Sequence, residues 1–363
     1  MFGTRTISRL IKHYSPSAEK TGAPPGTLVH IGRKRLEKVI IEAVNYNQET
    51  KDFKRLESVN ELREFYVDDT LTDKRTWVHI QGLHDVETIR AIGEQFGLHS
   101  LVMEDILHTE QRPKLENYTN YLFITLPAYH HEESQDEWVY EQVSLVLGHN
   151  YVLLFQESDY NYMEPVVERL KTENSRIRQR GSDYLAYAII DVMVDYFFGI
   201  IDVIEHEMEM VEDRMLDTST TDLREQIYDL RRLILSLRRS LRPLREVVQK
   251  LTNVGTDLIH ENTLMFLRDV SDHVVINLEN LEHNREIILN MMETYQASLS
   301  MKMNEVMKVL TMMCEGLQDL RDQLESARDQ RKALLNQRSA HEAPPASGMR
   351  PQPGDKPVRG DYT

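Results

Sequence analysis

The stretch that decides the fold is HSLVMEDILHTEQRPKLE, residues 99–116. Its first part, about 99–108, is a short amphipathic segment whose apolar residues recur at the spacing of one helical face. The run YLFITL at 121–126 follows closely and is rich in the aromatic and β-branched residues that are typical of strands. The stretch therefore predicts a short helix, with the adjacent carboxylates of Glu104 and Asp105 on it, that leads into a sheet.

Strands and helices alternate on both sides of this stretch, from residue 27 to about 160. A further helix is expected at about 86–97, and a hairpin where Gly148–Asn150 joins two apolar runs. The runs that read as strands are 28–31, 38–44, 77–80, 121–126, 141–147 and 151–155. Interleaved elements of this kind predict an α/β domain over residues 27–160, with a mixed sheet and flanking helices.

From about residue 161 the chain is almost entirely helical, and residues 161–251 predict a helical layer. Its helices are expected at about 161–174, 180–216 and 221–251. Around a break at Asp217–Thr221 the charges are segregated, because acidic residues gather over 205–229 and basic residues over 231–250. The pattern is typical of a solvated helical hairpin with cross-paired charges, and a surface that concentrates divalent cations is the alternative.

The last helix is expected to start near Asn262 and meets no breaker before Gly316. Beyond Gly316 the residues step by three and four, as in the heptad repeat of a coiled coil with one charged position. These residues are Leu317, Leu320, Leu324, Ala327, Arg331 and Leu334. A stalk helix over 262–338 measures roughly 115 Å at 1.5 Å per residue. Because so long a helix is stable in water only with partners, the sequence predicts self-association through a soluble coiled coil.

The composition excludes several classes of function. The 363 residues include 43 Lys and Arg and 59 Asp and Glu, a formal charge of −16, which argues against a nucleic-acid partner. A single cysteine, Cys314, excludes an intramolecular disulfide and a cysteine-cluster metal site, and it fits a reducing, cytosolic setting. The sequence has no Gly-x-Ser-x-Gly, no phosphate-binding glycine loop and no His-Glu-x-x-His, so we do not expect an enzyme.

The ends of the chain and its most apolar segment bear on its location. Residues 1–26 predict a disordered tail, with a short basic amphipathic helix as the alternative, and the proline-rich residues 339–363 predict a second disordered tail. The best candidate for a membrane span, 184–204, is interrupted by Asp191, Asp195 and Asp202. Because a charge at the centre of a bilayer costs at least ~2.5 kcal/mol, this segment predicts a core helix with an acidic face, and no span is expected.

In their order along the chain, several motifs resemble those of the CorA-type magnesium transporters. The most specific is the opening stretch, residues 99–116. The supporting motifs are PPGTLV (24–29), EQVSL (141–145), DYL (183–185), PLRE (243–246), RDVSDH (268–273) and NEVMKVLT (304–311). The resemblance covers about residues 24–313. It implies a cytosolic α/β domain, an acidic helical hairpin and a long stalk helix. In the family, which resides in the inner or plasma membrane, five chains assemble with their stalks lining a funnel.

The chain departs from the family pattern after Met313. The family would continue into an apolar membrane helix that ends in Gly-Met-Asn and then into a second span, whereas this chain continues with Cys314–Asp319 and contains no Gly-Met-Asn. We therefore interpret it as the magnesium-sensing cytosolic domain and stalk of a magnesium and cobalt transport protein, at the cytoplasmic face and without its own pore. The alternatives are a soluble coiled-coil interaction protein that has lost ion conduction, and a modulatory subunit of full-length transporters.

The resemblance also implies regulatory sites at which Mg2+, with Co2+ as a second candidate, bridges neighbouring copies. Asp105 and Asp269 match one of these sites. A second site is matched by Glu104, Asp191 and Asp269, with His273 as a further candidate. Carboxylates suit this ion. Mg2+ keeps several of its water ligands, so one or two carboxylates are enough to bind it. Because its helix is very apolar, the alternative for Asp191 is a carboxylate that is capped or paired within the core.

Two stalk residues, Glu293 and Asn304, match the cytosolic pore mouth of the family and would form rings in a homopentamer. Methionines of the same segment fall largely on one stripe, which predicts packing between stalks, with a soft-metal site as the alternative. They are Met301, Met303, Met307, Met312 and Met313.

Overall fold

The computed structural model describes residues 24–66, 73–132, 137–216 and 223–341. The chain divides into two compact units, residues 1–295 and 296–363. The tails expected at 1–26 and 339–363 lie almost wholly outside the described residues, as does the break expected at Asp217–Thr221. The first residues of the expected C-terminal tail are described, and they are helical: the last helix extends to His341, past its expected end at 338.

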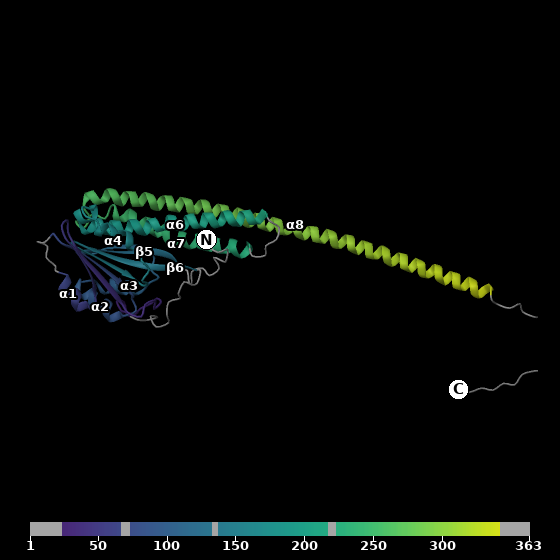
Figure 1. The fold of residues 1–363 in the computed structure, drawn as a ribbon, viewed down its shortest axis with the longest axis horizontal. Coiled ribbons are helices and arrows are strands. Elements are labelled where there is room, and N and C mark those ends of the chain that lie inside the picture. Colours follow the sequence, from purple (N-terminus) through teal and green to yellow (C-terminus); the bar gives the residue numbers. More distant parts are fainter. Residues whose placement is uncertain (1–23, 67–72, 133–136, 217–222, 342–363) are drawn as a thin grey trace, which may run out of the picture. The chain divides into compact units, whose positions relative to one another are not determined.

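Seven strands of the described residues form one mixed sheet in the first unit (Figure 1). The strands are β1 (Ile40–Tyr46), β2 (Lys51–Leu56), β3 (Arg75–Gln81), β4 (Lys114–Asn117), β5 (Tyr121–Glu132), β6 (Glu137–Gly148) and β7 (Tyr151–Gln156). Their order across the sheet is β2-β1-β3-β7-β6-β5-β4. Strands β3 and β7 run parallel and their neighbours antiparallel. The expected hairpin through Gly148–Asn150 is confirmed, with Leu147 opposite Val152.

The prediction of a strand at 28–31 is wrong. Ile31 makes an isolated bridge to His108 instead, because its N–H donates to the Leu107 carbonyl and its own carbonyl accepts from the Thr109 N–H. This segment therefore pairs with the end of a helix rather than with the sheet.

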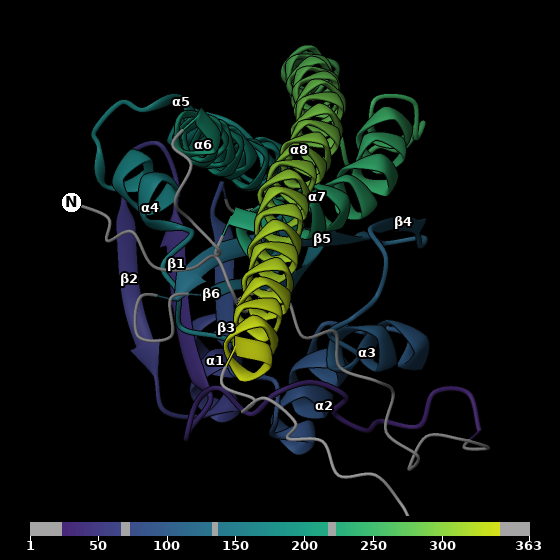
Figure 2. The same ribbon diagram turned by 90° about the vertical axis from the view of Figure 1, so that its right-hand side faces the viewer.

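Three short helices cover one face of the sheet: α1 (Val59–Phe65), α2 (Val86–Gln95) and α3 (Ser100–Leu107) (Figures 1 and 2). Leu62, Ile89 and Ile106 of these helices are buried in one cluster with Ile80 and Phe123 of the sheet. Burial of their apolar sides fixes the helices and leaves the polar side of α3 near the edge strand β4, where the candidate site begins.

Two further short helices and three long ones cover the other face in the part of the chain that the structure describes. They are α4 (Glu164–Lys171), α5 (Arg176–Gln179), α6 (Ser182–Leu216), α7 (Leu223–Leu251) and the part of α8 (Glu261–His341) that belongs to the first unit. Phe197 of α6, Leu237 of α7 and Val270 of α8 share a core with Ile124 and Leu145 of the sheet. The apolar segment 184–204 thus lies inside α6 and is largely buried. In the described part of the chain, we find no helix with the length and apolar character needed to cross a membrane.

Helix α8 passes from the first unit into the second without interruption. In the first unit its inward residues, such as Val270, Val274 and Leu281, are fully buried. In the second unit every residue from 301 to 338 is exposed. The expected fold class, a mixed α/β sheet domain followed by long helices, is confirmed.

Candidate divalent-cation sites

Glu104 and Asp105 lie on the last turn of α3. The helix is capped by His99, whose Nδ1 accepts from the Leu101 N–H at 3.2 Å. Glu104 accepts the N–H of Gly26 at 2.6 Å and so ties the preceding turn to the helix. Gly26 has φ of +83°, a left-handed conformation that glycine adopts without strain. Glu104 thus already has a structural partner within one chain.

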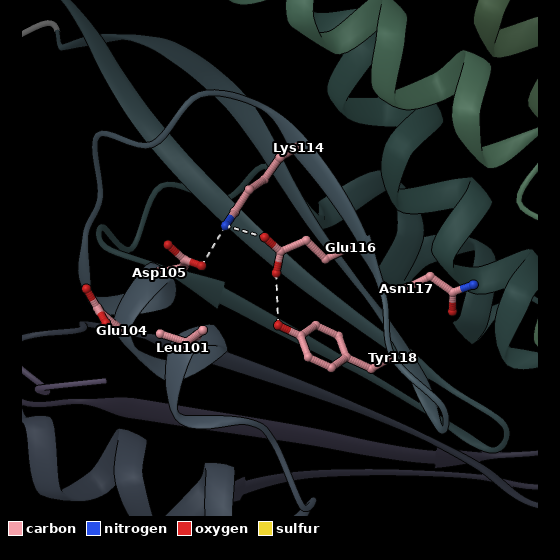
Figure 3. A pocket seen from close by; sticks show the side chains of 7 residues that line it. All are labelled: Leu101, Glu104, Asp105, Lys114, Glu116, Asn117 and Tyr118. Carbon is pink, nitrogen blue, oxygen red and sulfur yellow. Dashed lines mark hydrogen bonds and ion pairs between the residues drawn. The ribbon is translucent and has the colours of Figure 1, made fainter. Parts of the chain in front are cut away.

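Asp105 lines a hollow of about 520 Å³ between α3 and β4 (Figure 3). Lys114 Nζ lies 2.6 Å from Asp105 Oδ2 and 2.7 Å from Glu116 Oε1, and Tyr118 donates to Glu116 at 3.0 Å. Burial works against the charge of Lys114, but its hydrogen bonds to the two carboxylates outweigh this and raise its pKa. The hollow therefore holds two carboxylates around a cation that the chain itself supplies.

Buried Gln142 on β6 holds the end of α3 in place through hydrogen bonds. Its Nε2 donates to the backbone carbonyl of Asp105 at 3.1 Å, and its Oε1 accepts the N–H of Gln111 at 2.8 Å. One side chain thus joins the end of the helix to the segment that leads into β4. This contact gives a physical role to the EQVSL motif at 141–145.

A second group of candidate ligands lies between α6 and α8. Asp191 and Asp195 are four residues apart on α6, and one ligand atom of each lies within 4.8 Å of the other and of His273 on α8. The Nδ1 of His273 is 3.6 Å from Asp195, and its Nε2 is 4.0 Å from Asp269. Arg169 of α4 lies 3.6 Å from Asp191. Among the residues that the structure describes, no other three His, Cys, Asp or Glu side chains come this close.

The electrostatics of this group favour a cation. Burial raises the pKa of Asp191, and the nearby charge of Asp195 raises it further, while Arg169 and His273 act in the opposite direction. Burial likewise raises the pKa of Asp195. Two neighbouring carboxylates, one buried (Asp191) and one half-exposed (Asp195), are costly to ionise together, and a cation that binds both lowers that cost.

The structure sorts the predicted ligands into two separate groups. Asp191, Asp269 and His273 come together where α6 meets α8. Glu104 and Asp105 lie on α3, which covers the opposite face of the sheet (Figure 2). Asp105 and Asp269 therefore do not meet within one chain, so a site made of both needs two copies.

Two predicted residues, Glu293 and Asn304, lie apart from both groups, and one candidate ligand, Asp195, was not predicted. Glu293 is exposed on α8 in the first unit, and Asn304 is exposed in the second. Asp195 is the ligand candidate that the sequence reasoning missed. Its signal was its spacing of four from Asp191, which places both carboxylates on one helical face.

Comparisons with known proteins agree with this architecture. The family described as "CorA-like Mg2+ transporter protein" matches residues 73–314. The chain is 38% identical over 297 residues to the "Cobalt/magnesium transport protein CorA" of Thermotoga maritima, a match that covers 81% of this chain and 82% of that protein. It is 28% identical to the "Putative metal ion transporter YfjQ" of Bacillus subtilis, over 65% of this chain and 72% of that one.

Among solved structures, the complete CorA magnesium transporter of Methanocaldococcus jannaschii aligns with a TM-score of 0.63 at 20% identity, covering 77% of this chain and 83% of that one. The soluble domain of the same transporter aligns with a TM-score of 0.57 at 16% identity, over 70% of this chain and 96% of that domain. These two likenesses concern the fold, and the family match and the Thermotoga relative carry the assignment. The chain belongs to the CorA-like Mg2+ transporter family.

Proposed function

We propose that this chain is the ion-sensing part of a CorA-family magnesium and cobalt transport system. Residues 27–160 and 161–251 form its head and residues 262–338 its stalk, and copies assemble as a homopentamer at the cytoplasmic face of a membrane. Mg2+ or Co2+ binds carboxylates where copies meet and stabilises the assembly. The observation that carries this role is the crowded pair Asp191 and Asp195, with His273 and Asp269 beside it.

The exposure of Asp269 suits a ligand shared between copies. Its side chain is 65% exposed, whereas the Asp191 side chain is 11% exposed. A buried carboxylate can fix the ion on one copy while an exposed one is accessible to the next. Because an ion that binds only the assembled form stabilises that form, occupancy and assembly are coupled.

Calorimetric titration of Mg2+ into the full chain tests the site. Asp191→Asn and Asp195→Asn preserve shape and remove charge, so we expect Mg2+ binding to weaken about tenfold or more. Both variants should unfold at a higher temperature than the wild type in chelator, since the repulsion is gone. Asp202→Asn, on the exposed side of the same helix, should bind like the wild type. Unchanged Mg2+ affinity in both test variants would place the site elsewhere.

A second candidate is a coiled-coil subunit that binds full-length transporters, modulates them and leaves ion conduction to them. The exposed apolar residues of α8 in the second unit favour it. Co-purification of a tagged chain with a full-length relative of the family tests this role. Recovery of the relative with the wild type, and its loss when Leu320 and Leu324 are changed to Asp, would support the modulatory role over the sensing homopentamer.

A further inference from the structure

A row of polar contacts follows the boundary between α6 and α8 in the first unit. Three pairs of side chains join the two segments: Asp183 and His260 at 3.0 Å, Asp195 and His273 at 3.6 Å, and Glu205 and Asn284 at 3.0 Å. The partners of the first pair are 77 residues apart in the sequence and those of the last pair 79. The separation is nearly constant, so the two helices run side by side in the same direction.

Asn277 lies in this row with its amide unpaired. It is one turn beyond His273 and two turns before Asn284, and its exposed fraction is 0%. Among the described residues, neither the amide nitrogen nor the amide oxygen of Asn277 has a hydrogen-bond partner, and the Oδ1 of buried Asn284 lacks one as well. Buried polar groups are nearly always hydrogen-bonded in folded proteins. This face of α8 is therefore not packed for maximal stability.

The surroundings of Asn277 are those of a core position. Val274 and Leu281 flank it on the same side of α8, and both are fully buried in one cluster with Ile201 of α6 and Leu237 of α7. An apolar side chain at position 277 would gain from burial here, whereas the asparagine amide gives up its water without a compensating bond from the protein. The backbone of α8 also approaches α6 and α7 less closely than these two helices approach each other. This part of α8 is therefore held less firmly than its two neighbours.

The cost of the unpaired amide falls only on the packed state. When α8 separates from α6, water reaches the amide and supplies the missing hydrogen bonds. Regions held by few favourable contacts open more often than the rest of a fold. We propose that Asn277 is a built-in weak point, at which residues 273–288 of α8 detach from α6 while the rest of the first unit stays folded.

This opening goes beyond the proposed ion sensing, and it needs no metal ion. The detaching segment begins at His273, which lies 3.6 Å from Asp195 in the packed state. An opening therefore moves one candidate ligand away from another and leaves the sheet unchanged. Asn277 acts here as a conformational device and not as a ligand.

Hydrogen exchange of the full chain in chelator tests the inference. Asn277→Leu and Asn277→Met each replace the amide by an apolar side chain, and methionine adapts to an irregular gap that leucine does not fit. In the better-fitting variant, we expect the backbone amides of residues 273–288 to exchange about tenfold or more slowly than in the wild type. Asn290→Leu makes the same change at an exposed position of the same helix and should exchange like the wild type.

Three results would overturn the inference. Wild-type exchange over 273–288 that is as slow as in the buried strand β5 would show that this segment does not open by itself. Unchanged or faster exchange in both apolar variants would show that the Asn277 amide is satisfied in the packed state. Equal slowing in Asn290→Leu would indicate the higher helix propensity of leucine. Because every measurement is made in chelator, a failure here leaves Mg2+ binding untouched, and a failed Mg2+ titration leaves this inference untouched.

Discussion

At Asp105 the chain supplies its own cation. Lys114 Nζ lies 2.6 Å from Asp105 and 2.7 Å from Glu116, and its side chain is 28% exposed. An ammonium brings one charge, whereas Mg2+ brings two and prefers carboxylate oxygens. If Asp105 is a regulatory ligand, as the family resemblance implies, the two cations compete for it, and Lys114 raises the Mg2+ concentration at which the site fills.

Replacing Lys114 with glutamine should therefore tighten Mg2+ binding by roughly fivefold or more, because it leaves two carboxylates without their cation. The measurement is the midpoint of a calorimetric Mg2+ titration. Lys171→Gln is the matched control, since Lys171 pairs with Glu168 at the surface at 2.8 Å. A midpoint that stays at the wild-type value, or moves to higher Mg2+, would show that Lys114 does not compete with the ion.

Glu141 gives the first unit a pH-dependent stability. It is buried beside Ser158, whose N–H and hydroxyl both donate to it, at 2.6 and 2.7 Å. Burial raises its pKa from 4.5 to about 7 and the hydrogen bonds with Ser158 only partly offset this. Because the folded chain holds this proton more tightly than the unfolded chain, the stabilisation is present below pH 4.5 and is lost as the pH rises through about 7.

Thermal unfolding of the wild type and Glu141→Gln between pH 5 and 8 measures this effect. The wild type should lose on the order of 3 kcal/mol more than the variant over the titration, since glutamine does not ionise. Ser144→Ala, a change at another buried polar residue of the same strand, should keep the wild-type slope. Parallel pH profiles for the wild type and Glu141→Gln would contradict the assignment.

At the scale of the elements, the apolar periodicity predicted α2, α3, α4, α6, α7 and α8 to within a few residues, but it did not predict the short helices α1 and α5. It did not predict β2 and β4, whose sequences KDFKRL and KLEN lack the alternation of apolar and polar residues. These are the two edge strands, and pairing with a neighbour defines them more than burial of their own side chains does.

Dependence on neighbouring elements also limited the prediction of the site. Glu104 and Asp105 were identified from a motif resemblance, but their partners were not. The ion pair with Lys114 exists because β4 lies beside α3, and the contact of Gly26 with Glu104 joins residues 78 positions apart. Contacts of this kind depend on the tertiary fold and leave no periodic signal in the sequence.

Helix α8 offers the prediction that belongs to this scale. Arg331→Leu should strengthen association of the chain, because it replaces a charge at a seam position by an apolar side chain. The dissociation midpoint on dilution, followed by light scattering, should fall about tenfold or more. Lys332→Leu removes the same charge and adds the same side chain one position off the seam. An equal effect of the two substitutions, or weaker association of Arg331→Leu, would contradict the heptad register.

For the whole molecule, the family assignment and the placement of the carboxylates both favour cation binding between copies of the chain. The chain carries two groups of candidate ligands on opposite faces of one sheet, and the members of one family-type pair, Asp105 and Asp269, cannot meet within a single copy. A cation that joins them must join two copies. We therefore expect Mg2+ binding to change the contact between chains.

Limited proteolysis of the full chain across a Mg2+ titration tests this coupling most directly. We predict that Mg2+ protects the wild type relative to chelator, and that Asp269→Asn or Asp105→Asn abolishes the Mg2+-dependent protection. Asp272→Asn, an exposed aspartate on the same helix, should keep it. Identical cleavage of the wild type in Mg2+ and in chelator, or full protection in Asp269→Asn, would contradict the account.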